Sequence, residues 1–170
     1  MKKTLYLSLF LLLLCVLRAN AQAGIDETNL ITRLTSINNL NVTDAVKYFT
    51  DRSYTLVSKQ TVPQATFSMD LYKYRLEGQT ASYLFSVIAG AVSGAGYITY
   101  NEDEYTQAIK TITDLGFVPG EATAPESGKT IYAKGNFRLM VQKKVANNKT
   151  FYVMMYSDLL KVATLSGFKK

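Results

Sequence analysis

A helix followed by β-strands occurs twice in this chain, and this repeat most constrains the possible folds. The second copy begins with a helix from Asn101 to Leu115, in which Asn101 can cap the first turn and Glu104 can complete the capping pair. Gly116 follows in the position where helices commonly end. One face of this helix is apolar at helical spacing and comprises Tyr105, Ala108, Ile109, Ile112 and Leu115.

The first copy begins 63 residues earlier, where Val42, Ala45, Val46 and Phe49 match the apolar face of the second helix. Each helix is followed by an extended segment, a proline-containing loop and two β-prone runs rich in Tyr, Phe, Val, Thr and Met. The extended segments are Ser53–Thr61 and Phe117–Ala122, with loops at Pro63 and at Pro119 and Pro125. The β-prone runs are Thr66–Glu77 and Ser82–Ala89 in the first copy, and Lys129–Lys144 and Thr150–Ser157 in the second.

Turn residues divide these runs into strands. Gly78-Gln79 and Asn147-Asn148 predict turns, and Gly135-Asn136 predicts a hairpin that would give the second copy a fourth strand. Ala89–Gly96 is apolar but rich in glycine, which weakens both helices and strands, so we interpret it as the connection between the copies. Short helices are predicted outside the repeat, at Asp26–Ile37 and Asp158–Leu165.

The sequence therefore predicts an α+β protein of two tandem helix–three-strand (αβββ) units, spanning residues 22–96 and 97–170, with the helices on one face of an antiparallel sheet. This element order resembles the tandem αβ modules of β-lactamase-inhibitor-like secreted bacterial proteins. It resembles more loosely small envelope modules in which helices precede a three-stranded meander. The inhibitors rely on disulfides, which the chain without its leader cannot form, so their target does not carry over.

Residues 1–21 have the pattern of a secretory signal peptide: Met1-Lys2-Lys3, an apolar run from Leu5 to Leu17, and the small-x-small sequence Ala19-Asn20-Ala21. The leader resembles bacterial export signals. We expect cleavage after Ala21, with an uncleaved membrane anchor as the alternative. The exported chain, periplasmic or extracellular, would lose Cys15, the only cysteine, and would carry 16 Lys and Arg against 13 Asp and Glu, a net charge of +3.

The composition excludes several kinds of catalysis. The sequence has no His, so it offers no imidazole base, no Ser-His or Cys-His pair and no His metal ligand. No phosphate-binding loop, nucleophile elbow, cofactor-binding motif or metal-ligand cluster occurs. Ser58 and Lys59 are adjacent, but neighbouring strand residues point to opposite faces and cannot cooperate. We therefore expect a protein without enzymatic activity or cofactor.

Strand alternation suggests a tyrosine-rich face for partner binding, because it would leave one sheet face uncovered by helices. Tyr, Met and Arg are enriched at protein-binding surfaces. Two alternatives are that two sheets pack together and that tyrosine merely tolerates half-exposure. The predicted face comprises Tyr72, Tyr74, Arg138, Met140, Lys144, Tyr152, Met154 and Tyr156.

Positive charge gathers at the end of the chain, where residues 129–170 contain nine Lys and Arg and a single acid, Asp158. Such a segment can meet an acidic protein or an anionic glycan or lipid, or it can simply keep a sheet edge soluble. We expect no nucleic-acid partner, because no nucleic-acid-reading motif is present. The leading hypothesis is an exported binding protein of the bacterial envelope or secretome. The alternatives are a small secreted hydrolase with an acidic site and an envelope subunit that binds a second copy of itself.

Overall fold

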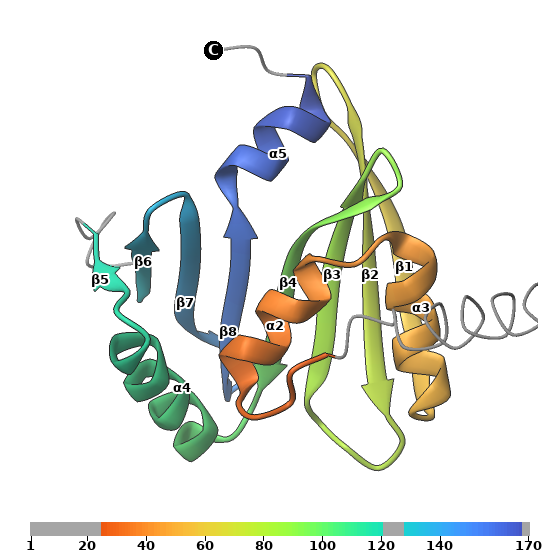
Figure 1. The fold of residues 1–170 in the computed structure, drawn as a ribbon. Coiled ribbons are helices and arrows are strands. Elements are labelled where there is room, and N and C mark those ends of the chain that lie inside the picture. The colour runs from red at the N-terminus through yellow and green to blue at the C-terminus, as the bar shows by residue number, and fades with distance from the viewer. Residues whose placement is uncertain (1–24, 121–127, 168–170) are drawn as a thin grey trace, which may run out of the picture.

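The structure is a computed structural model that describes residues 25–120 and 128–167. The predicted signal peptide, Pro125 and the end of the segment Phe117–Ala122 lie outside the described residues. Within them the helices are α2 (Leu30–Asn38), α3 (Val42–Asp51), α4 (Glu102–Asp114) and α5 (Leu159–Ser166). The strands are β1 (Tyr54–Pro63), β2 (Ser68–Leu76), β3 (Ser82–Ile88), β4 (Ala91–Thr99), β5 (Val118–Pro119), β6 (Lys129–Lys134), β7 (Phe137–Ala146) and β8 (Lys149–Asp158) (Figure 1).

The strands form one antiparallel sheet in the order β1-β2-β3-β4-β8-β7-β6-β5. In each half of the sheet the strands follow chain order from the edge to the centre, β1 to β4 in one half and β5 to β8 in the other. Strands β4 and β8 pair at the centre. Helix α3 precedes the first half and α4 precedes the second. The predicted α+β class with an antiparallel sheet is thus confirmed. The predicted three strands after each helix are corrected to four in each half of the sheet.

The fourth strand of the first unit corrects one prediction. Ala89–Gly96 is not a connection, because Ala91–Thr99 forms β4, which pairs with β3 on one side and β8 on the other. A Cβ on Gly94 would lie 2.9 Å from Ser86 Oγ, and one on Gly96 would lie 3.0 Å from the Met154 carbonyl oxygen. The absence of a side chain at these two glycines therefore lets the neighbouring strands approach β4 closely. The predicted boundary between residues 96 and 97 therefore lies inside β4.

The predicted helix start at Asn101 and the turn at Asn147-Asn148 are confirmed, but Glu104 does not complete the predicted capping pair. The Asn101 N–H donates to Thr99 Oγ1 instead, and the Glu104 carboxylate accepts from the Tyr97 hydroxyl. Asn101 accepts hydrogen bonds from the backbone N–H groups of Asp103 and Glu104 at the start of α4, and Gly116 follows the helix at φ 79°. The predicted turn Asn147-Asn148 adopts φ values of 52° and 58°, which asparagine tolerates better than most residues.

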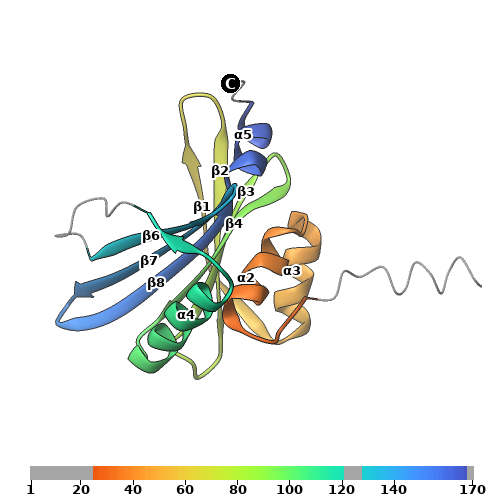
Figure 2. The ribbon, with the colours of Figure 1, turned by 60° about the vertical axis from the view of Figure 1, so that its left-hand side comes forward.

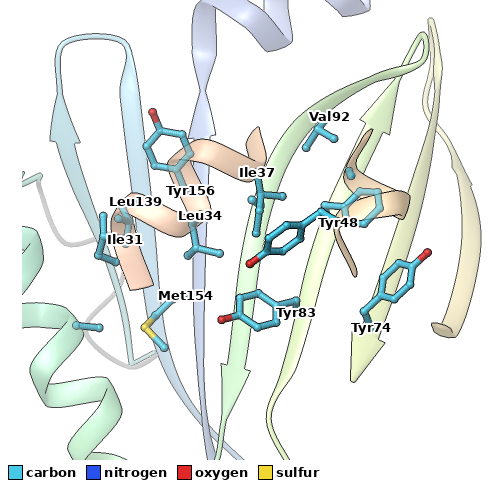
Figure 3. Packing of buried hydrophobic residues seen from close by; sticks show 14 of the residues in the cluster. Ile31, Leu34, Ile37, Tyr48, Tyr74, Tyr83, Val92, Leu139, Met154 and Tyr156 are labelled. Carbon is cyan, nitrogen blue, oxygen red and sulfur yellow. The ribbon is translucent and has the colours of Figure 1, made fainter. Parts of the chain in front are cut away.

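A single apolar core joins α2, α3 and α4 to one side of the sheet (Figures 1 and 2). Ile31, Leu34 and Ile37 of α2 belong to the same buried cluster as Leu139, Met154 and Tyr156 of the sheet, and Ile37 lies beside Tyr48 of α3 (Figure 3). Phe49 of α3 packs against aromatic rings of the first unit. Helix α5 adjoins the end of α2, where Lys161 donates a hydrogen bond to the Asn38 carbonyl.

Candidate functional site: the open face of the sheet

Strand alternation gives the sheet two sides. We call the side that packs against the helices the helix side, and the opposite side the open face. The cross-strand pairs Met140–Met155, Gly96–Met155, Leu84–Gly96 and Lys73–Leu84 mark the open face from β7 to β2. Within the described residues no helix packs on the open face.

Five of the eight residues predicted for the binding face lie on the helix side instead. Tyr72, Tyr74, Met154 and Tyr156 belong to the core or pack against it. Tyr152 is 2% exposed and stacks on Tyr105 of α4, with ring centroids 4.4 Å apart. The expectation that these five form an exposed face is wrong, because α2, α3 and α4 cover them.

The other three, Arg138, Met140 and Lys144, do lie on the open face. Their neighbours across the β7–β8 ladder are Ser157, Met155 and Phe151. The prediction had matched these three to Tyr152, Met154 and Tyr156, which is a shift of one residue in β8. Such a shift moves every side chain to the other face.

On the helix side, each charged strand residue has a local partner. Lys59 Nζ lies 3.1 Å from Asp70 Oδ2, and Lys143 Nζ lies 3.6 Å from Glu102 Oε1. Lys134 donates to the carbonyl of Leu115 at 2.7 Å. The two acids of the described strands, Asp70 and Asp158, both have helix-side positions.

The open face carries positive charge without acidic partners. Arg138 donates to the backbone carbonyls of Gly135 and Phe137, at 2.7 and 2.8 Å. No carboxylate of the described residues lies within ion-pair distance of any of the six cations on this face. These cations are Lys73, Arg75, Lys129, Arg138, Lys144 and Lys149.

The predicted basic segment at the end of the chain is therefore divided by the fold. Helix-side contacts are made by Lys134, Lys143 and Lys161. The open face carries Lys129, Arg138, Lys144 and Lys149. Lys169 and Lys170 lie outside the described residues. The first unit adds Lys73 and Arg75 to the open face, which the sequence pattern did not reveal.

Half-buried apolar side chains lie among these cations. On both sides of the centre they form a band across six strands, comprising Leu71, Leu84, Ile98, Phe151, Met155, Met140 and Ile131. Apolar residues with Met and Arg among them are characteristic of the buried part of protein interfaces. The open face therefore combines apolar contact area with unpaired positive charge.

One end of the open face contains a pocket of about 380 Å³, which we call the end pocket. It lies where the β2–β3 turn meets the end of β4 and the start of β8. Three of its side chains are cationic and none is acidic. The lining residues are Lys73, Arg75, Gln79, Thr80, Ser82, Ile98, Tyr100 and Lys149.

A second pocket, of about 510 Å³, lies on the helix side between α2 and α4. Two of its three charged groups are already engaged with tyrosines of the sheet: Arg33 donates to the Tyr83 hydroxyl at 2.5 Å, and Tyr97 donates to Glu104 Oε2 at 3.1 Å. Burial, together with the nearby Glu104 charge, raises the pKa of Tyr97 above its usual value. The groups in this pocket mainly join the helices to the sheet.

The described residues show no cluster of three or more potential metal ligands. Ser58 and Lys59 sit on opposite faces, and Lys59 pairs with Asp70. None of the helices between residues 25 and 167 is long and apolar enough to cross a membrane.

Comparison with protein-family models, with curated protein sequences and with solved structures found no match for this chain.

Proposed function

We propose that this chain is an exported, non-enzymatic binding protein that captures an acidic protein on its open face. The observation that carries the proposal is the separation of charge between the two sides of the sheet. On the helix side, the strand cations Lys59 and Lys143 have carboxylate partners, whereas the six open-face cations have no carboxylate partner among the described residues. Like charges gathered on one face repel each other, and a partner bearing carboxylates would remove that repulsion.

The apolar band favours a protein as the partner. Leu71, Leu84 and Met155 are only half-buried, and a protein surface could cover them while its acidic side chains meet the surrounding cations. A flexible anionic glycan would satisfy the cations but would leave much of this apolar surface in contact with water. The partner we propose is therefore an acidic envelope or extracellular protein with some apolar side chains at its surface.

Self-association through the open face is less favourable. A second copy placed face to face would bring its own six cations against the first set, and no acid of the described strands lies on either face to offset them. Like charges opposed across an interface cost several kcal/mol. The charge distribution thus disfavours a homodimer built on this face.

The proposal can be tested by affinity capture from an envelope extract, with residues 22–170 as bait, at low and high salt. Lys129→Gln plus Lys144→Gln removes two charges from the open face, outside the end pocket. Lys47→Gln plus Lys110→Gln removes two exposed charges from α3 and α4 and serves as the matched control. We expect the wild type and the control variant to capture an acidic protein at low salt. Capture should be lost at high salt, and it should be lost with the variant Lys129→Gln plus Lys144→Gln.

Equal recovery by both double variants would contradict the proposal, because binding would not depend on the open face. Recovery of no acidic protein by the wild type, in an assay that retrieves a known complex, would also contradict it.

A further inference from the structure

We propose that the end pocket anchors a carboxylate of the partner protein; this inference rests on the proposed function and adds a specific site to it. The carboxylate could be an Asp or Glu side chain or the C-terminus of a chain, since both present the same group.

The charge of the pocket comes from three elements that meet at one end of the sheet. Lys73 and Arg75 are two residues apart on β2 and so point to the same side, and Lys149 starts β8 next to the end of β4. None of the three has an ion-pair or hydrogen-bond partner among the described residues. An arginine guanidinium can bind a carboxylate through two parallel hydrogen bonds, and lysines add further positive charge.

Ser82 supplies a second, independent indication of a ligand. This residue is only 3% exposed, yet it lines the pocket, and its hydroxyl has no hydrogen-bond partner in the described part of the chain. The Ser82 oxygen is open to the pocket, since the fully enclosed side-chain atoms without a partner in the described part of the chain are Arg33 Nε and Asn38 Oδ1. A ligand oxygen could accept the Ser82 proton.

The pocket's size and apolar wall match a side chain or chain end better than a large group. Its volume of about 380 Å³ is near the lower end of the range for small-ligand sites. Ile98 and Tyr100 form part of the wall and could contact the carbon atoms of the entering group. Since the proposed partner is a protein, its ordinary anionic group is the carboxylate.

The test is a titration of ¹⁵N-labelled residues 22–170 with three synthetic hexapeptides, followed by amide NMR shifts. One is hexaglutamate blocked at both ends, one is hexaglutamine blocked at both ends, and one is hexaglutamine with a free C-terminal carboxylate. We expect a carboxylate-bearing peptide to shift the amides of Gln79, Thr80 and Ser82, and blocked hexaglutamine to leave them unchanged. Binding by hexaglutamate would assign an acidic side chain, and binding by the free-ended peptide would assign a chain end.

Two exposed pocket residues allow a matched comparison. Arg75→Gln and Lys149→Gln should each weaken peptide binding about tenfold, which corresponds to about 1.4 kcal/mol. The double variant Lys47→Gln plus Lys110→Gln should bind within a factor of two of the wild type. The inference is overturned if blocked hexaglutamine binds equally well, if the shifts lie away from the pocket, or if the pocket variants bind like the control.

Failure here is distinguishable from failure of the proposed function. If Lys129→Gln plus Lys144→Gln abolishes partner capture but Arg75→Gln and Lys149→Gln affect neither capture nor peptide binding, the open face binds the partner without the pocket. If none of these substitutions affects capture, both proposals fail.

Discussion

The ring of Tyr74 lies almost parallel to the ring of Phe49, with centroids 4.8 Å apart and an interplanar angle of 13°. This contact joins β2 to α3 and leaves Tyr74 only 2% exposed. A tyrosine expected from the sequence to bind a partner therefore forms part of the core that joins the first helix to the sheet.

Replacing Tyr74 should destabilise the protein. We expect Tyr74→Ala to lower the free energy of unfolding by about 3 kcal/mol, because it removes a buried ring and leaves a cavity beside Phe49. The matched control is Tyr100→Ala, at a tyrosine that is 49% exposed, with an expected change of about 0.5 kcal/mol or less. Urea denaturation measures both. Equal effects of the two substitutions would contradict the assignment of Tyr74 to the core.

A second prediction concerns the close approach of β4 to β3. Gly94→Ala would place its Cβ 2.9 Å from Ser86 Oγ, which is itself hydrogen-bonded to Ser93 Oγ at 2.9 Å. We expect a loss of about 2 kcal/mol from this crowding. Ser86→Ala removes the crowding atom, so the double variant should be less destabilised than the sum of the two single variants. A double-mutant cycle by urea denaturation measures this coupling, and simple additivity would contradict the packing described.

These two sites show how much of the fold could be predicted from the sequence. Helix α4, its cap at Asn101 and the turn at Asn147-Asn148 depend on local backbone chemistry, which the sequence displays directly. Strand β4 was missed because Gly94 and Gly96 are unfavourable in an isolated strand. The reason for these glycines, the close approach of β3 and β8, is a long-range contact that local patterns do not contain.

The candidate site was only partly predictable for a related reason. Strand β8 lies at the centre of the sheet and is apolar on both sides, with Tyr152 and Met154 alternating with Val153 and Met155. Alternation separates the two sets but does not say which set faces the helices. Only the register with β7, in which Leu139 pairs with Tyr156, decides this. The open-face position of the basic residues follows from the same register.

Stability should fall at high pH because of Tyr48. Burial, reinforced by the nearby Glu27 carboxylate and partly offset by Arg33 and Arg52, raises the pKa of Tyr48 to about 12. In the unfolded chain a tyrosine loses its proton near pH 10. Between about pH 10 and pH 12 the unfolded chain therefore binds fewer protons than the folded one, and the free energy of unfolding decreases as pH rises.

Tyr48→Phe tests this prediction. The variant loses the hydrogen bond from the Tyr48 hydroxyl to Glu27 at 3.3 Å, so its stability should be lower at every pH. Its further loss between pH 9 and pH 11.5 should nevertheless be smaller than that of the wild type. Tyr100→Phe, at an exposed tyrosine, should follow the wild type. An equal pH-dependent loss in the wild type and Tyr48→Phe would contradict the prediction.

Charged and apolar residues of the open face should affect different rate constants for partner binding. We expect Lys129→Gln plus Lys144→Gln mainly to slow association, several-fold at low salt, because charges on the open face steer the encounter. Met155→Ala should mainly accelerate dissociation, since it removes apolar contact area. Surface plasmon resonance with the captured partner separates the two effects. An association rate that is insensitive to both salt and the lysine pair would contradict electrostatic steering.

Site-specific photo-crosslinking tests the central claim, that the open face binds the partner, most directly. The photoreactive residue p-benzoylphenylalanine is placed at position 151, on the open face, or at position 110, on the exposed side of α4. Each protein is then irradiated with the acidic partner. We predict a covalent adduct from position 151 and none from position 110. An adduct from position 110 alone, or equal adducts from both positions, would contradict the assignment of binding to the open face.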